Sequence, residues 1–335
     1  MRAAAKDSCP LCGQPVHLVA DGFPGYRVGM RYSIMECESC AASHASPLLV
    51  DEGIYGQIYE QISCVPGYNR YHHYAGEVLR RPDPLTYLSR QEESYWAVAR
   101  ALRTKRTGAG RLKVLEVGCG LGYFTYAMVR DGFDVIGVDI SPKAIAWASD
   151  HYGPYYAEMT MEDLKSKGER YDFIVMNQLI EHIPDVHTFL SDALKLLSGE
   201  GDLIMTTPNK SVYQGGIWET DLPPVHLWWF GEEAMRYLAA RHGCTVSFVD
   251  FAQYTDKHFR VKDQPGGLAD RHPILDELGT VIVRQEIAPD GKTKRLIERA
   301  GAMDLLRSAR GALQRKARWR GARGPILAAL FRSTW

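Results

Sequence analysis

Residues 114–124 read VLEVGCGLGYF, an apolar run that continues into three glycines at alternate positions. Gly118, Gly120 and Gly122 leave the backbone without a Cβ, so a ligand can approach the chain closely at this turn. Glu116 stands two residues before the first glycine. The spacing G-x-G-x-G differs from the G-x-G-x-x-G of dinucleotide sites, where a pyrophosphate lies at the turn. A carboxylate beside the turn repels a pyrophosphate and suits a ligand that carries a cationic amine.

A second carboxylate, Asp139, lies 17 residues after Gly122, at the end of the next predicted strand, residues 134–140. In this position a carboxylate can accept hydrogen bonds from both hydroxyl groups of a ribose. An amino acid joined to a nucleoside fits both acids, and S-adenosylmethionine is a molecule of this kind. The pattern therefore predicts a site for S-adenosylmethionine at the carboxyl ends of two neighbouring strands.

Strands and helices alternate along the chain around the glycine turn. Short apolar runs predict strands, and apolar residues at helical spacing predict helices. The predicted strands are residues 112–118, 134–140, 171–177, 201–208, 244–252 and 279–286, and the predicted helices are 91–106, 123–132, 141–150, 187–199 and 231–243. Such alternation is typical of βαβ units and a mostly parallel sheet, so the predicted fold class is α/β.

Four motifs in this order, LEVGCGLGYF, VDIS, MEDL and DFIVMNQLIEHIPD, resemble those of class I S-adenosylmethionine-dependent methyltransferases. The similarity covers roughly residues 90–285, and the group it most resembles includes ubiquinone-pathway O-methyltransferases and many sugar and natural-product methyltransferases. The resemblance implies a Rossmann-like, doubly wound and mostly parallel sheet of seven strands. We therefore expect a zinc-ribbon and substrate-cap segment at 1–78, a methyltransferase domain at 79–288, and a basic amphipathic helical tail at 289–335.

The same resemblance implies which residues bind the cofactor. Glu116, Gly118 and Gly120 would hold the methionine end of S-adenosylmethionine. The other expected contacts are Gly122, Tyr123 and Phe124 at the turn, Asp139 at the ribose, Ile140, Met161 and Glu162 around the adenine, and Asn177 and Gln178 on the sulfonium side. Many relatives have Asp where this chain has Thr160, which puts the Glu162 contact in question, and Glu162 or Asp163 could instead cap a helix.

Two histidines are candidates for the general base of a methyl transfer to a hydroxyl. The reaction needs an acceptor in line with the C–S bond and a group that removes the hydroxyl proton. His182 follows the predicted strand 171–177, and His226 lies in the loop after strand 201–208, so both should face the methyl group. Imidazole titrates nearest neutral pH, which suits this task. The EHIPD element occurs in family members with many acceptors, so His182 could instead hold a loop.

Aromatic and acidic residues near these histidines have alternative roles. Trp228 is a candidate for acceptor contact, although the aromatic run 228–230 more often forms core or pocket wall. Glu181 and Asp185 could bind a catalytic metal ion. The chain lacks the additional acidic cluster of metal-dependent, catechol-type relatives, so we expect metal-free chemistry.

Four of the seven cysteines form two pairs, Cys9 with Cys12 and Cys37 with Cys40, separated by 24 residues. Two C-x2-C pairs at such a distance are typical of a tetrahedral zinc site with four thiolate ligands. In a chain without an export signal, a disulfide framework is not the first interpretation. The pattern therefore predicts a structural Zn²⁺ site in an N-terminal ribbon.

The segment after the ribbon, residues 55–77, is expected to cover the mouth of the active site. Tyr68, Tyr71, His72 and His73 within it are candidates for contact with the acceptor. A surface cluster of aromatic side chains without a ligand is the alternative interpretation.

Charge is unevenly distributed along the 335-residue chain, whose formal net charge is zero. From residue 292 onward, twelve Lys and Arg accompany two acids, a net charge of +10, so residues 1–291 carry −10. The acidic body argues against extensive nucleic-acid binding by the main fold. We expect residues 302–324 to form a basic helix that lies on an anionic membrane surface, packs on the acidic body or pairs with another subunit, with Trp335 nearby.

Location and function follow from these features as expectations. Without an apolar run of about 18 residues or an N-terminal apolar segment, the expected location is the cytoplasm, with peripheral membrane contact through the tail as an option. The expected function is S-adenosylmethionine-dependent methyl transfer to a small-molecule hydroxyl on a sugar, glycan precursor or specialised metabolite, which could be lipid- or nucleotide-linked. The alternatives are an RNA methyltransferase that uses the ribbon and tail, a C- or N-methyltransferase acting on a nucleotide-linked sugar, and a non-catalytic cofactor-binding protein.

Overall fold

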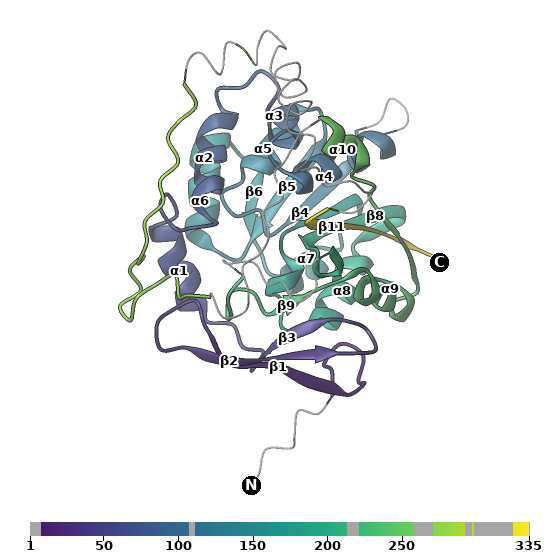
Figure 1. Cartoon of the computed structure of the whole chain (residues 1–335). Coiled ribbons are helices and arrows are strands. Elements are labelled where there is room, and N and C mark those ends of the chain that lie inside the picture. Colours follow the sequence, from purple (N-terminus) through teal and green to yellow (C-terminus); the bar gives the residue numbers. More distant parts are fainter. Residues whose placement is uncertain are drawn as a thin grey trace.

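The molecule consists of a central sheet covered by helices on both faces, with a smaller sheet beside one end (Figure 1). A computed structural model describes residues 8–106, 111–212, 221–257, 271–291, 297 and 324–334. Within these residues, no helix is both long and apolar enough to cross a membrane. The basic helix expected at 302–324 lies outside the described residues except for its last position, and Trp335 also lies outside them.

The central sheet has seven strands in the order β10-β11-β8-β7-β4-β5-β6. Their bounds are β4 Lys113–Val117, β5 Asp134–Asp139, β6 Tyr156–Glu158, β7 Tyr171–Asn177, β8 Leu197–Pro208, β10 Cys244–Phe248 and β11 Ile326–Ser333. The pairs from β8 through β6 are parallel, and β11 is antiparallel to both of its neighbours. This confirms the predicted Rossmann-like sheet. The chain order reverses between β4 and β7, which is where such sheets bind ligands, at the carboxyl ends of the strands.

The prediction of a final strand at residues 279–286 was wrong, because β11 supplies the seventh strand. Within 279–286, Val281 is buried, but Ile282 and Val283 are 49% and 61% exposed. The backbone N–H of Val281 donates to the Gln61 side chain and that of Gln285 to the Cys64 carbonyl, so neither joins a sheet ladder. The segment ILAALF in β11 is a nearly continuous apolar run, as a strand covered on both faces requires. The expected tail therefore contributes a strand next to β8.

The two faces of the sheet are covered by different helices. Two neighbouring residues of β4, which point to opposite faces, show this. Leu115 packs in the cluster that contains Leu190 and Met235, whereas Val114 packs with Leu102 and Phe124. Helices α7 Met161–Lys167, α8 Val186–Lys195 and α9 Glu232–Arg241 cover the first face, and α4 Glu93–Lys105, α5 Tyr123–Arg130 and α6 Pro142–Tyr152 cover the second. Helix α10, Ala252–Lys257, packs near α4.

The N-terminal sheet has four strands in the order β1-β2-β3-β9 and lies at the lower end of the molecule in Figure 1. Strands β1 Val16–Pro24, β2 Arg31–Cys37 and β3 Ser43–Ser46 come from the expected ribbon. The fourth strand, β9 Trp228–Trp229, comes from the long connection after β8 and pairs antiparallel with β3. The ribbon is therefore joined by a backbone ladder to the loop that contains His226.

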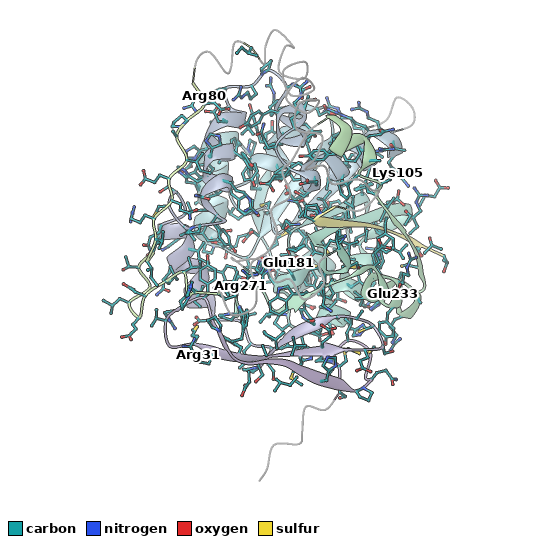
Figure 2. All side chains as sticks on the ribbon, in the orientation of Figure 1. Arg31, Arg80, Lys105, Glu181, Glu233 and Arg271 are labelled. Carbon is teal, nitrogen blue, oxygen red and sulfur yellow. The ribbon has the colours of Figure 1, made fainter. Side chains whose placement is uncertain are left out.

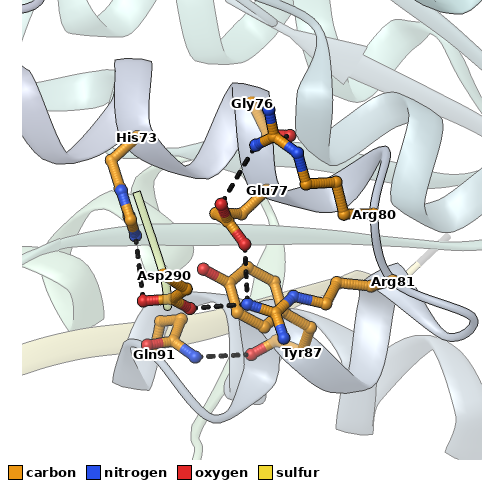
Figure 3. A network of polar contacts seen from close by, with 8 residues as sticks. All are labelled: His73, Gly76, Glu77, Arg80, Arg81, Tyr87, Gln91 and Asp290. Atoms are coloured by element: carbon orange, nitrogen blue, oxygen red, sulfur yellow. Dashed lines mark hydrogen bonds and ion pairs between the residues drawn. The ribbon is translucent and has the colours of Figure 1, made fainter. Parts of the chain in front are cut away.

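Three short helices and an extended segment cover the second face of the domain near the site. They are α1 Glu52–Glu60, α2 Asn69–Val78, α3 Pro84–Ser89 and residues 271–291, which run along α1 and α2 (Figure 1). The guanidinium of Arg81 bridges Glu77 at 2.7 Å and Asp290 at 2.5 Å, and Asp290 also lies 3.8 Å from the imidazole of His73 (Figure 3). Because these groups are mostly buried, the network fixes the end of the segment to α2.

Candidate functional site

A cavity of about 1180 Å³ lies at the carboxyl ends of β4, β5 and β7 and extends under α1 and α2. Its wall at one end contains the glycine turn and Asp139, and its wall at the other contains His182 and His226. The cavity therefore connects, without interruption, the residues predicted to bind the cofactor and those predicted to act on the acceptor.

The three glycines of the turn each meet a different constraint. All three have positive φ, which L-residues rarely adopt. A Cβ on Gly118 would lie 2.8 Å from the Leu179 side chain, and one on Gly120 would lie 3.2 Å from the Tyr59 hydroxyl. Gly118 and Gly120 line the cavity, so their bare backbone faces a ligand. Gly122 was predicted to contact the cofactor, but it starts α5 away from the cavity wall, where a Cβ would meet Tyr156 at 2.5 Å.

Asp139 is held by two backbone N–H groups, one in the glycine turn and one at the start of α6. Its Oδ2 accepts a hydrogen bond from the Gly120 N–H at 2.9 Å, and its Oδ1 accepts one from Ser141 at 2.9 Å. Burial raises the pKa of this carboxyl, although the backbone donors oppose that effect. The next residue, Ile140, is 70% exposed and lines the cavity, so it offers an apolar surface next to a carboxylate. Asp139, expected at the ribose, and Ile140, expected at the adenine, therefore both line the cavity.

Glu116 is a buried carboxylate at the end of β4, 3% exposed. Its side chain accepts a hydrogen bond from the hydroxyl of Thr125. Burial raises the pKa of Glu116 to about 8, and the neighbouring Asp139 adds to the increase. A cationic group in the cavity would stabilise the charged form of this side chain.

Glu116→Gln is expected to stabilise the ligand-free protein, more at pH 8 than at pH 5. Folding raises the pKa of Glu116 from 4.5 to about 8. The free energy of unfolding is therefore highest below pH 4.5 and decreases as the pH rises toward 8, because the unfolded state ionises more readily. Removing the titration should raise the free energy of unfolding by roughly 1–3 kcal/mol at pH 8. Thermal melts at both pH values measure this, with exposed Glu162→Gln as the control. An equal shift at both pH values would contradict it.

The other predicted cofactor residues divide into two groups. Tyr123, Phe124, Met161, Asn177 and Gln178 line the cavity. Glu162 does not: its side chain is 77% exposed and pairs with Lys165 at 2.6 Å. The structure thus corrects the expected adenine contact of Glu162, because α7 directs this side chain to solvent. The alternative interpretation holds for Asp163, which forms a capping box with Thr160 at the start of α7.

His182 and His226 lie next to each other at the far end of the cavity, with ring centroids 4.6 Å apart. His182 follows β7 in the short helix Ile180–His182, and its Nδ1 lies 2.5 Å from the Val225 carbonyl oxygen. The Nδ1 of His226 lies 3.5 Å from Asp221 Oδ1. Burial lowers the pKa of both histidines to about 3. The neighbouring His226 lowers the pKa of His182 further, and the positive charge of Arg70 lowers that of His226. Both rings are therefore neutral near pH 7.

Glu181 completes this cluster and is fully buried. Figure 2 places it in the interior, whereas Lys105 and Glu233 lie toward the periphery. Neither carboxylate oxygen has a hydrogen-bond partner of normal geometry among the described residues, and burial raises its pKa to about 8. The other predicted metal-binding candidate, Asp185, lies elsewhere: it is the N-cap of α8, where it accepts a hydrogen bond from Thr188 at 3.1 Å.

Tyrosines from the cap segment form much of the remaining cavity wall. Tyr68 and Tyr71 line the cavity as predicted, but the sequence analysis missed Tyr55 and Tyr59, whose i, i+4 spacing on α1 places them on one helix face. It also missed Arg70, whose Nε lies 2.9 Å from Glu92 and whose guanidinium donates to the Tyr71 hydroxyl at 2.8 Å. The local sequence contains a signal for the tyrosines but none for this ion pair, which joins residues 22 positions apart.

Three residues predicted to contact the acceptor do not line the cavity: His72, Trp228 and His73, whose imidazole lies 3.8 Å from Asp290. His72 is not among the cavity-lining residues, because it faces out of α2. Trp228 is 2% exposed and also lies away from the cavity wall; its indole N–H donates to the Ile183 carbonyl at 3.0 Å, and its ring stacks on Phe230. Trp228 is therefore core between the ribbon and the domain, as the alternative interpretation allowed.

The four N-terminal cysteines come together as predicted. The Sγ atoms of Cys9 and Cys40 are 3.7 Å apart, those of Cys12 and Cys37 are 3.4 Å apart, and all four lie within 4.8 Å of one another. A tetrahedral zinc ion with Zn–S bonds of about 2.3 Å requires sulfur atoms about 3.8 Å apart. The thiols therefore fit a four-coordinate zinc ion.

The sheet order, the glycine turn and the two carboxylates define the class of Rossmann-like proteins that bind a nucleoside-containing ligand. A family described as "Methyltransferase domain" matches residues 73–247, and the chain belongs to this family. The comparisons thus confirm the predicted resemblance to methyltransferases.

Individual relatives are more distant. The chain is 34% identical over 106 residues to a ubiquinone biosynthesis O-methyltransferase of Azorhizobium caulinodans, covering 30% of this chain and 42% of that protein. It is 35% identical over 111 residues to the protein of the same name from Bartonella bacilliformis, covering 32% and 45%. It thus spans less than half the length of these relatives. A structure of a SAM-dependent methyltransferase from Archaeoglobus fulgidus is 17% identical, with a TM-score of 0.42 and coverage of 72% of this chain and 94% of that one.

Proposed function

We propose that this protein transfers the methyl group of S-adenosylmethionine to a hydroxyl oxygen of a small molecule. The observation that carries the proposal is the single cavity that joins the glycine turn, Glu116 and Asp139 to the pair His182 and His226. Family membership supports methyl transfer, and the name of the two curated relatives supports oxygen as the acceptor atom.

The cavity residues fit the cofactor. When bound, S-adenosylmethionine supplies a methyl group on a positively charged sulfur. Glu116 accepts from Thr125 and has acceptor capacity left for the ammonium group. Asp139 would accept from the ribose hydroxyls, and exposed Ile140 would pack against the adenine. Gly120 lets the methionine portion approach the backbone, since a Cβ would fill the space toward Tyr59.

The opposite end of the cavity suits a small acceptor with hydroxyl groups. Tyrosine rings pack well against the faces of sugars and aromatic rings, and their hydroxyls can form hydrogen bonds with the substrate. The guanidinium of Arg70 is neutralised by Glu92, so the wall offers no unbalanced charge to an anionic acceptor at this point. We propose a sugar, glycan precursor or specialised metabolite as the acceptor, with the neutral histidine pair acting on its hydroxyl.

A methyl-transfer assay tests the function directly. The full chain is incubated with S-adenosylmethionine labelled in the methyl group and with sets of sugars, nucleotide-linked sugars, phenols and RNA. Labelled product with a small hydroxyl compound and formation of S-adenosylhomocysteine are expected. Transfer to RNA alone, or an absence of cofactor binding by calorimetry, would contradict the proposal.

Asp139→Ala is expected to weaken binding of S-adenosylmethionine by about 1–3 kcal/mol, the range for a lost pair of charge-assisted hydrogen bonds. Isothermal titration calorimetry measures the change. The matched control is Glu162→Gln, which removes a neighbouring but exposed carboxylate and should leave the affinity unchanged. Unchanged affinity in Asp139→Ala would remove this residue from the site.

We further propose that Cys9, Cys12, Cys37 and Cys40 hold one structural zinc ion. The arrangement of their sulfur atoms supports this assignment. Metal analysis of protein purified without chelator should show one zinc equivalent more than in the Cys12→Ser, Cys37→Ser double variant. Cys64→Ser, a buried cysteine outside the cluster, is the control and should retain the zinc. Equal zinc content in the wild type and the double variant would reject the site.

A further inference from the structure

Three metal-ligating side chains converge at the acceptor end of the cavity. Glu181 and His182 come from the short helix after β7, and His226 comes from the connection before β9, 44 residues later. One ligand atom from each lies within 4.8 Å of the other two. All three residues line the cavity, so a bound ion would face its interior.

The contacts behind the two imidazoles are those of metal-binding histidines. A carbonyl oxygen can only accept, so in the neutral ring the Nδ1 of His182 donates to Val225 and its Nε2 carries a lone pair. The backbone of Gln178 is a second contact of this imidazole. The Nδ1 of His226 lies 3.5 Å from Asp221 Oδ1, close to but not in hydrogen-bond geometry. Metal-bound histidines usually donate their second ring nitrogen to a backbone carbonyl or a carboxylate. His182 has a partner of the first kind, and a carboxylate lies beside His226.

Glu181 provides an independent observation. Its side chain is completely buried, and neither carboxylate oxygen has a hydrogen-bond partner of normal geometry among the described residues. The donors next to it, the Thr207 hydroxyl and its own backbone N–H, do not reach normal hydrogen-bond geometry. A buried carboxyl group with such poor partners is costly, and pairing with a cation is one of the few ways to compensate it. The carboxyl group of Glu181 therefore lies beside the imidazoles of His182 and His226, and one cation could be bound by all three side chains.

We infer that Glu181, His182 and His226 bind a divalent transition-metal ion whose open positions face the acceptor. Two imidazoles and one carboxylate favour ions such as Mn²⁺, Fe²⁺, Co²⁺ or Zn²⁺ over Mg²⁺ and Ca²⁺, which prefer oxygen ligands alone. This site has no thiolate and is distinct from the cysteine cluster. The inference replaces the expectation of metal-free chemistry, which was based on an acidic cluster that the sequence lacks.

The inference rests on the proposed function and specifies how the hydroxyl is activated. An acceptor oxygen at an open position becomes more acidic, since the ion stabilises the negative charge that forms on it. The hydroxyl proton passes to water in the cavity, the oxygen forms a bond to the methyl carbon, and the bond from that carbon to sulfur breaks. The products are the methyl ether and S-adenosylhomocysteine. The histidines then orient the ion rather than take the proton themselves.

Metal binding is tested with Mn²⁺ on the full chain, without acceptor or cofactor. Electron paramagnetic resonance of free Mn²⁺ should show one bound ion per chain, with affinity reduced at least about 10-fold in Glu181→Gln and in His226→Ala. His151→Ala, which removes an exposed histidine stacked on Trp147, is the matched control and should bind like the wild type. The absence of Mn²⁺ binding, or equal binding in the wild type and both variants, would overturn the inference.

A Co²⁺ spectrum distinguishes the Glu181 cluster from the cysteine cluster. His226→Asn is the substitute variant in case one of the first two does not fold. Co²⁺ at the Glu181 cluster should give ligand-field bands without the strong sulfur charge-transfer bands of a thiolate site. If Glu181→Gln or His226→Ala does not fold by circular dichroism, His226→Asn is measured in its place and must lose the same affinity. Cofactor binding by calorimetry is read separately. Methyl transfer that continues in protein shown to lack this ion overturns the inference but leaves the proposed function intact, whereas failure to bind the cofactor rejects the function itself.

Discussion

His226→Ala is expected to lower the turnover number of methyl transfer about 100-fold or more, while the affinity for S-adenosylmethionine stays within about twofold. The ring lies at the acceptor end of the cavity, 4.6 Å from that of His182, and its side chain is 13% exposed. Its removal takes away a group that acts on the acceptor hydroxyl, either directly or through a bound ion. The cofactor contacts at Glu116 and Asp139 come from other strands and should remain.

The assay compares turnover and cofactor affinity in His226→Ala, His182→Ala and the control His151→Ala. The control should show wild-type turnover, since the exposed His151 ring stacks on Trp147 away from the cavity. If His182→Ala carries the whole loss and His226→Ala none, the acceptor is handled by His182. If neither variant loses turnover, positioning of the acceptor is sufficient and the role of the histidine pair is rejected.

A chain that ends at Asp290 is expected to lose cooperative folding, because it lacks β11. This strand lies between β8 and β10 and forms antiparallel ladders with both. Its side chains Leu327, Ala329 and Phe331 are at most 1% exposed. Removing it leaves β10 without a partner, exposes one edge of β8, which remains paired with β7, and opens the core of the sheet. Thermal melts followed by circular dichroism should show a cooperative transition for the full chain and none for the shortened one.

A single substitution tests the same strand with less disruption. Phe331→Ala should lower the free energy of unfolding by about 3–5 kcal/mol, the usual cost of removing a buried aromatic ring. Val283→Ala is the matched control, since this side chain is 61% exposed and lies in the segment that the sequence had indicated as a strand. Its change should stay within about 0.5 kcal/mol. The reverse order of the two effects would mean that residues 279–286 complete the sheet.

These results also constrain any study of the basic tail. The proposed contact of this tail with an anionic membrane cannot be tested by cutting the chain at Asp290, since that also removes β11. A vesicle-binding experiment must keep residues 324–334 and replace basic residues before them. Only then does a loss of binding report on the charge of the tail rather than on unfolding.

Local patterns predicted most residues that line the cavity at the glycine turn, with Gly122 and Glu162 as the exceptions. The glycine turn, Glu116 and Asp139 were predicted from their spacing alone, because a strand, a tight turn and a helix follow one another directly in the chain. The two cysteine pairs were also predicted, since each C-x2-C turn is local and only one pairing of turns is available. Short-range geometry therefore explains why these positions could be identified without a fold.

The tertiary structure decided what the sequence could not. Residues 279–286 and 326–333 have similar strand propensity, and only the choice of partners for β8 and β10 selects the second segment. At the acceptor end the strand order predicted that His182 and His226 would face one point, but not that Glu181 would join them or that Tyr55 and Arg70 would reach the same cavity from the cap. These side chains are brought together by long-range packing of the ribbon, the cap and the connection after β8. The spacing of residues along the chain contains no information about contacts made at that distance.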